Sequence, residues 1–382
     1  MKVVAAIDSF KGSMSSVKAG EAVKAGIRRV YPDAQVKVFP LADGGEGTTE
    51  ALIQRMGGRM VNCSVKGPLG ELLECEYGIL EDNKTAVMEM AAAAGLVLVP
   101  EEKRNPLAAT TYGVGEMIRN GIEKGCRKFI VGIGGSATND GGIGMLQALG
   151  FSILDKEGKQ VGFGGGELEK IFRIHAGDAI PELNDCTFRV ACDVRNPLCG
   201  PKGASAVYGP QKGATLKMVE CMDKGLMHFA KVAKEIFPKA DDSCPGAGAA
   251  GGLGFAFQAF LNGTLESGVK IILEETDLAE NIKDADYVIT GEGRLDGQTM
   301  QGKVPVGVAE LAKQYGRPVL AFTGSAGAEA ELCNKAGIDA FFPIIRSAVS
   351  LEEAMKEDNA VRNMTDTVEQ VFRLIKIHDS SK

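Results

Sequence analysis

A short apolar strand pattern followed by a helix pattern occurs at both ends of the chain and not in its middle. Near the start, residues 3–7 and 36–39 have the pattern of buried strands, and an amphipathic helix pattern follows each. Near the end the same pattern recurs at residues 287–289, 319–322 and 341–345. Neither end alone has enough strands for a stable sheet. We therefore expect both ends to form one five-stranded, doubly wound parallel sheet of an α/β fold.

The middle of the chain is different. Residues 61–66, 70–80 and 85–90 are short strand-like runs joined by turns, which is typical of hairpins. We predict a discontinuous domain of residues 1–61 and 285–382, with a mixed α/β domain of residues 62–284 inserted into it. The substrate cleft is expected between these two domains.

Composition narrows the class of protein. The chain has 382 residues, 45% of them hydrophobic and 24% charged, with a net charge of −7 and no basic stripe, so nucleic acid is not an expected partner. It starts on a strand pattern without a signal peptide, and no apolar run is long enough to span a membrane. Nine cysteines without a C-x-x-C pair argue against a disulfide framework, so we expect a cytoplasmic protein. The oligomeric state, homo-oligomer included, is left open.

Residues 286–303 have the pattern of a strand, a glycine-rich loop and a helix. The loop carries Glu292, Arg294, Asp296 and Lys303. Ligands of open α/β sheets bind at the carboxyl ends of the strands, so two acids and two bases there suggest a phosphate and metal site. A surface turn is the alternative interpretation.

The same combination of residue types follows four predicted strands. The four groups are Asp8 with Lys11, Asp43 with Glu46, Asp193 with Arg195, and Glu292 with Arg294 and Asp296. Carboxylates hold Mg²⁺, basic side chains neutralise a transferring phosphate, and glycines let the backbone approach it. These are the parts that phosphoryl transfer needs.

Two glycine-rich segments match dinucleotide fingerprints. Residues 132–137 fit G-x-G-x-x-A after a strand, and the backbone of Gly134, Gly135 and Ser136 is a candidate phosphate cradle. Residues 246–251 fit G-x-G-x-x-G but follow no strand, which favours helix packing through small residues. No G-x-x-x-x-G-K-[ST] motif occurs, so this is not a P-loop protein.

Five motifs resemble those of the type I glycerate kinases, in the family's order and nearly end to end. They are Asp8-Ser-Phe-Lys-Gly-Ser13, Ala42-Asp-Gly-Gly-Glu-Gly-Thr48, Gly132-Ile-Gly-Gly-Ser-Ala-Thr-Asn-Asp-Gly-Gly142, Cys192-Asp-Val-Arg-Asn-Pro-Leu198 and Thr290-Gly-Glu-Gly-Arg-Leu-Asp296. The resemblance implies phosphorylation of D-glycerate by ATP with Mg²⁺, usually at the 2-hydroxyl. It also implies a flavodoxin-like domain that carries an inserted second domain.

Chemistry suggests roles for the substrate-side residues. The glycerate carboxylate needs a cation, and Arg195 or Arg294 offers a bidentate fork, with Asp8 a further substrate-binding candidate. We prefer Arg195, although it could instead pair with Asp193 to fix the loop. Asp193 or Asp296 is the candidate for accepting the proton of the attacking hydroxyl.

Other residues are assigned to phosphate and metal. Lys11 or Lys303 is expected to neutralise phosphate oxygens. Asp43, Glu46 and Asp296 are the candidate ligands of Mg²⁺.

Alternatives remain open. Phosphorylation at the 3-hydroxyl would need the same parts. A nicotinamide-dependent hydroxy-acid dehydrogenase would use residues 132–137 as its fingerprint, with Asp155 near the distance expected for a ribose-binding acid. A solute-binding protein that closes on a sugar acid is a non-enzymatic alternative.

Overall fold

The computed structural model describes residues 1–41, 47–297, 299–301 and 303–379. The chain divides into two compact units. We call the first the terminal unit; it comprises Met1–Asp43, Glu50–Arg55 and Val269–Lys382. The second, the inserted unit, comprises Gly44–Thr49 and Met56–Gly268. The predicted domain bounds, 1–61 with 285–382 and 62–284, stay a prediction.

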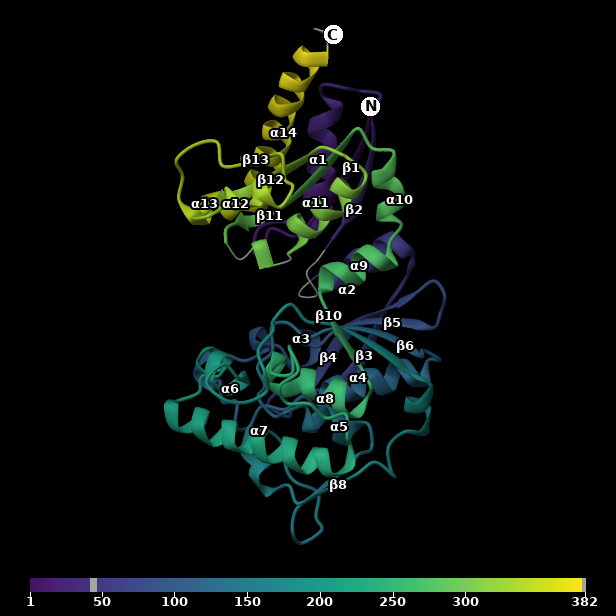
Figure 1. The fold of residues 1–382 in the computed structure, drawn as a ribbon, viewed down its shortest axis with the longest axis vertical. Helices are drawn as coiled ribbons and strands as arrows, with labels where there is room; N and C mark the ends of the chain where they lie inside the picture. Colours follow the sequence, from purple (N-terminus) through teal and green to yellow (C-terminus); the bar gives the residue numbers. More distant parts are fainter. Residues whose placement is uncertain (42–46, 298, 302, 380–382) are drawn as a thin grey trace. The chain divides into compact units, whose positions relative to one another are not determined.

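The sheet of the terminal unit joins strands from both ends of the chain (Figure 1). Its order is β13-β12-β11-β1-β2 and every neighbouring pair is parallel, which confirms the predicted five-stranded α/β sheet. In the central register Val3 pairs with Tyr287, and on the other side Lys2 pairs with Gln35. The strands are β1 (Lys2–Ile7), β2 (Gln35–Pro40), β11 (Tyr287–Leu295), β12 (Val319–Ala326) and β13 (Ala340–Pro343).

Helices cover both faces of this sheet. Alternate residues of β1, such as Val3, Ala5 and Ile7, share one core with α1 (Ser16–Arg28) and α14 (Glu357–Asp379). Because side chains alternate across a strand, Val4 and Ala6 face the opposite side, where α11 contacts β1, β11 and β12. The remaining helices are α9 (Gly268–Glu275), α10 (Leu278–Lys283), α11 (Val304–Gln314), α12 (Leu332–Lys335) and α13 (Leu351–Met355). Helix α2 (Thr48–Met56) has residues in both units.

The inserted unit contains a mixed six-stranded sheet of order β10-β9-β6-β5-β4-β3. The pairs β3–β4 and β4–β5 are antiparallel, as the hairpin pattern predicts, and the other pairs are parallel. Its strands are β3 (Gly58–Lys66), β4 (Leu72–Leu80), β5 (Thr85–Glu89), β6 (Lys128–Gly132), β9 (Thr187–Ala191) and β10 (Thr264–Glu266); β7 (Ser152–Leu154) and β8 (Arg173–His175) form a separate pair.

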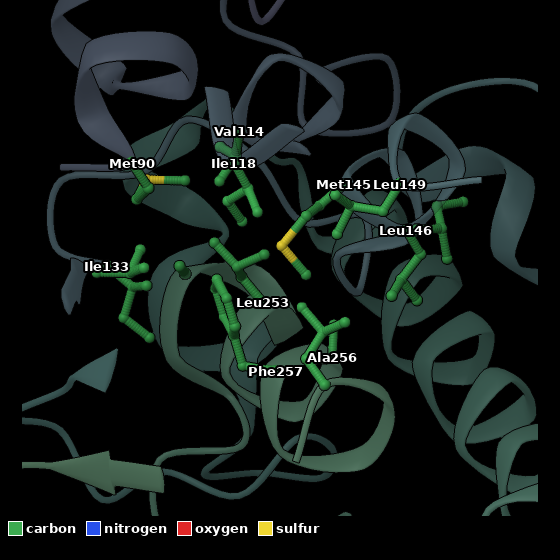
Figure 2. Close-up of a cluster of buried hydrophobic side chains, with 14 of the residues drawn as sticks. Met90, Val114, Ile118, Ile133, Met145, Leu146, Leu149, Leu253, Ala256 and Phe257 are labelled. Carbon is green, nitrogen blue, oxygen red and sulfur yellow. The ribbon is translucent and has the colours of Figure 1, made fainter. Parts of the chain in front are cut away.

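The core of the inserted unit packs helices against this sheet (Figure 2). Side chains from α4, α5 and α8 meet there and are buried, among them Val114, Met145, Leu146 and Phe257. The helices are α3 (Ala91–Ala94), α4 (Tyr112–Glu123), α5 (Ile143–Ala148), α6 (Ala204–Tyr208), α7 (Leu216–Ile236) and α8 (Leu253–Phe260). Across the described part of the chain, no helix combines the length and apolar character that a membrane crossing requires.

Candidate active site

A pocket of about 320 Å³ opens in the terminal unit where β1, β11 and β12 end. Its charged lining residues are Asp8, Lys11, Glu292, Arg294 and Lys303. In the strand order β13-β12-β11-β1-β2, strands β1 and β11 flank the point at which the winding direction of the sheet reverses. Ligands of doubly wound sheets bind at that point. The pocket therefore lies where the fold favours a ligand.

The loop after β1 is held by its own backbone. Asp8 is buried, its N–H donates to the carbonyl oxygen of Gly291 at 3.0 Å, and its carboxylate accepts from the N–H of Ser9 at 2.6 Å. Phe10 and Met14 then exchange backbone hydrogen bonds of 2.9 and 3.1 Å. Between them the chain makes a tight turn, which leaves the Lys11 side chain exposed at the pocket.

Glu292 and Lys303 form one wall of the pocket. The Glu292 carboxylate is buried, accepts a 2.6 Å hydrogen bond from the Thr299 hydroxyl and lies 3.7 Å from the Lys303 ammonium. Arg294 extends from the same strand, and its Nε lies 3.3 Å from the Asp296 carboxylate. Two predicted cations are thus each oriented by an acid, while the Arg294 side chain remains 66% exposed.

The predicted metal ligands are only partly described. Asp43 and Glu46 lie outside the described residues, whereas Asp296 lies beside Arg294. Among the described residues no cluster of three or more His, Cys, Asp or Glu side chains is arranged for a metal ion. Mg²⁺ bound to nucleotide phosphates needs only one or two protein carboxylates, with water and phosphate oxygens completing its shell. Of the three predicted ligands, Asp296 lies among the described residues, and its role in holding Mg²⁺ stays a prediction.

The inserted unit carries the other predicted residues, at the carboxyl ends of β6 and β9. These strands are neighbours, with Gly132 paired to Ala191. Gly134 and Gly135 after β6 are exposed, and so are Asp193 and Arg195 after β9. Asp193 accepts a 3.2 Å hydrogen bond from the N–H of Gly268.

Arg195 has no hydrogen bond or ion pair with another described residue. The alternative in which it pairs with Asp193 to fix the loop therefore finds no contact in the described structure. Its guanidinium is exposed. That leaves all its donors available to a ligand.

Ser136 has an unexpected partner. Lys212, at the end of a short 3₁₀ turn, is 2% exposed and its ammonium donates to the Ser136 hydroxyl at 2.7 Å and to the Thr138 carbonyl oxygen at 2.6 Å. Burial lowers the pKa of Lys212 to about 7, and the nearby Asp140 carboxylate opposes this effect. The buried Lys212 side chain therefore stabilises the candidate phosphate-binding loop through these two hydrogen bonds.

The second glycine fingerprint is also part of this packing. Gly251 has φ +67°, and a Cβ there would overlap the Thr138 carbonyl. Only glycine allows this close approach of two backbones. The segment at residues 246–251 thus packs against the loop after β6.

Sequence reasoning missed three features. Lys212 lies in a Gly-Pro-Gln-Lys-Gly turn, and such a lysine is ordinarily exposed. Glu89, at the end of β5, accepts from the N–H groups of Gly47 and Thr49 at the start of α2, at 3.3 and 2.9 Å. The apolar wall of the pocket comes from segments distant in sequence, among them Phe10, Ile344 and Met355. The sequence signals this apolar wall only through the loop that follows the last predicted parallel strand.

Comparison with known proteins identifies the family. Residues 3–376 match the model of the glycerate kinase family. The chain is 48% identical to a glycerate kinase of Halalkalibacterium halodurans, with 99% of this chain and 98% of that protein covered. It is also 48% identical to the glycerate 2-kinase of Escherichia coli K12, over 96% of this chain and 98% of that one.

A solved structure shows the same fold. The crystal structure of a protein provisionally named glycerate kinase 2, from Salmonella typhimurium LT2, matches with a TM-score of 0.91 and 44% identity and covers 100% of this chain and 99% of that one. A match of the family model over nearly the whole chain, with relatives this similar, leaves one assignment: the chain belongs to the glycerate kinase family.

Proposed function

We propose that this protein transfers the terminal phosphoryl group of ATP to the 2-hydroxyl of D-glycerate, giving 2-phosphoglycerate and ADP. The observation that carries the proposal is the terminal-unit pocket, in which Lys11, Arg294 and Lys303 gather at strand ends beside buried acids. Phosphoryl transfer depends mainly on positioning and on neutralising the charge of the phosphate oxygens. A pocket with three cations at strand ends supports that chemistry.

The charged residues of the terminal unit serve the phosphate side of the reaction. Lys11 and Lys303 neutralise phosphate oxygens, and Glu292 orients the Lys303 ammonium from 3.7 Å away. Asp296 would hold Mg²⁺, together with Asp43 and Glu46. When bound, Mg²⁺ neutralises part of the charge on the transferring phosphate.

The exposed loop after β9 serves the glycerate side. Arg195 binds the carboxylate through two parallel charge-assisted hydrogen bonds. Asp193, whose carboxylate is fixed by the N–H of Gly268, accepts the proton of the attacking hydroxyl. Arg294 and Asp296 are the second choices for these two roles, and Asp8 remains a substrate-binding candidate. The backbone of Gly134 and Gly135, with Ser136 held by Lys212, is a further phosphate contact.

The cysteines support a reducing compartment as the location. All nine are free thiols, including Cys63 and Cys75, whose sulfur atoms lie 3.5 Å apart without a bond. We therefore propose a cytoplasmic enzyme.

A direct assay tests the proposed reaction. The protein is incubated with D-glycerate and Mg-ATP, ADP formation is followed, and phosphorus NMR distinguishes 2-phosphoglycerate from 3-phosphoglycerate. We expect glycerate-dependent ADP release with 2-phosphoglycerate as the product. A parallel incubation with hydroxypyruvate and NADH tests the dehydrogenase alternative. NADH oxidation without ADP formation would reject the kinase.

A further inference from the structure

The terminal-unit pocket has an apolar wall that the roles above do not use. Phe10 and Ile344 line it and are buried, and Met355 of α13 lines it too. Ile345 and Leu351 line it as well, yet they are 43% and 74% exposed. Exposed aliphatic side chains grouped at a pocket are typical of a surface that a ligand covers.

We propose that this wall binds the adenine ring and ribose of the nucleotide, with the polyphosphate extending toward Lys11, Arg294 and Lys303. The inference rests on the proposed use of ATP and assigns the nucleoside to a definite part of the molecule. One pocket then offers an apolar surface for a flat base and cations for its charged tail. That division matches the two chemical halves of a nucleoside polyphosphate.

The apolar wall of the pocket suits glycerate poorly. The pocket volume of about 320 Å³ falls within the usual range for small-molecule sites, about 300 Å³ or more, and far exceeds the space of a three-carbon acid. Ile344, Ile345 and Leu351 offer no partner for its two hydroxyls. A hydroxyl placed against them without a hydrogen bond would lose its water contacts and gain none in return.

The wall is joined to the loop that carries Lys11. A Cβ added to Gly12 would lie 2.9 Å from the terminal methyl of Met355, so α13 contacts the turn between Phe10 and Met14. The turn that carries Lys11 therefore adjoins the apolar wall at Met355. A base against Met355 would place its phosphates on the side of Lys11.

Asn363 supplies a polar group at the same pocket. It lines the pocket from α14, and its amide has no hydrogen bond with another described residue. An amide presents a donor and an acceptor side by side, which is the pattern that pairs with the edge of adenine. The site therefore has an edge contact for the base besides its apolar face.

The test measures ADP binding to the full chain by titration calorimetry, with Mg²⁺ and without glycerate. The double variant Ile345→Gln/Leu351→Gln keeps side-chain size and removes apolar surface that is already exposed, so folding should be unaffected. We expect ADP affinity to fall by about 10-fold or more, because the base loses its apolar contact. Inorganic tripolyphosphate, which has no base, should bind both proteins equally.

A matched control uses the same change elsewhere in the terminal unit. Leu374 and Ile377 of α14 are 67% and 66% exposed and do not line the pocket. The double variant Leu374→Gln/Ile377→Gln should bind ADP as the unaltered protein does. Equal ADP affinity in both double variants, or no ADP affinity in the unaltered protein, would overturn the inference.

The same measurements separate this inference from the proposed reaction. If ADP binding weakens in the pocket variant but D-glycerate is not phosphorylated by the unaltered protein, the nucleoside site stands and the proposed reaction fails. If D-glycerate is phosphorylated and the pocket variant raises the KM for glycerate instead of weakening ADP, the pocket takes the acid and the inference fails.

Discussion

Both units have a lysine beside a strand-end loop, but the two lysines have opposite surroundings. Lys303 of the terminal unit lines an open pocket, where its side chain is 32% exposed and faces Glu292. Lys212 of the inserted unit is enclosed and donates to Ser136 and to the Thr138 carbonyl. The comparison teaches that a lysine near a glycine-rich loop serves a ligand only where the loops leave a hollow. Where glycines allow backbone segments to pack closely, as around Lys212, the lysine is buried and its hydrogen bonds stabilise the loop.

The largest effect is expected from replacing Lys303, the lysine that lines the pocket. Lys303→Met should lower kcat by about 100-fold or more, since a cation directed at developing phosphate charge is lost. Lys303→Arg should recover part of the rate because it restores the charge. Steady-state kinetics measure both. Lys313→Met, which removes a surface lysine paired with Asp339 in the same unit, is the control and should leave kcat unchanged. Near-normal turnover in Lys303→Met would break the comparison.

A second test concerns the acid beside Arg294. Asp296→Asn removes a charge with little change of shape, and we expect kcat to fall by roughly 100-fold with a higher Mg²⁺ requirement. Turnover measured across a Mg²⁺ series checks this. Asp339→Asn alters a surface ion pair of the same unit and is the control. Unchanged turnover and Mg²⁺ dependence in Asp296→Asn would show that Asp296 only orients Arg294.

A smaller effect is expected at the exposed loop of the inserted unit. Arg195→Lys replaces a planar fork by a point charge, so the efficiency with D-glycerate should fall by about 10-fold, which corresponds to ~1.4 kcal/mol. The slow rate with glycerol, which lacks the carboxylate, should hardly change. Should both substrates lose the same factor, Arg195 does not read the carboxylate and Arg294 becomes the candidate.

The effect of the enclosed lysine should appear in the stability of the protein. Because burial lowers the pKa of Lys212 to about 7, the unfolded chain binds more protons than the folded protein between about pH 7 and the ordinary lysine pKa of 10.5. The contribution of Lys212 to the free energy of unfolding should therefore increase as pH rises through that window. The contribution amounts to at most about 1.4 kcal/mol per pH unit.

The variant Lys212→Met removes this titration. Denaturant unfolding at pH 7.5–9.5, on the order of two pH units inside that window, should give a flatter pH dependence in the variant than in the unaltered protein. Lys303→Met, whose lysine lies in an open pocket, is the matched comparison and should keep the original slope. Parallel curves for Lys212→Met and the unaltered protein would mean that Lys212 stays protonated when buried.

The terminal sheet could be predicted because its signals are local. Short β-branched runs such as Val288-Ile289, each followed by a helix pattern, indicate parallel strands without knowledge of the rest of the chain. Lys11, Arg294 and Lys303 could be grouped in advance because strand ends meet at one edge of a sheet. These inferences need only the order of strands.

The apolar wall and the buried lysine could not be predicted in that way. Leu351 and Met355 reach the pocket through a short helix whose position depends on how α14 packs. Lysine is almost never fully buried, so no pattern marks Lys212 as internal. The Thr138 carbonyl that accepts from Lys212 also lies against Gly251, a contact that only the folded chain displays.

The pairing of β1 with β11 sets an order for folding during synthesis. Lys2 and Asp286, at the edge of this pairing, are 284 positions apart. A ribosome therefore completes the inserted unit, which ends at Gly268, before the central partner of β1 exists. Two lone N-terminal strands are too few to be stable in water. While the inserted unit folds, we expect β1 of the nascent chain to lack its partner β11. The first strand to be translated is then among the last to be incorporated into a complete sheet.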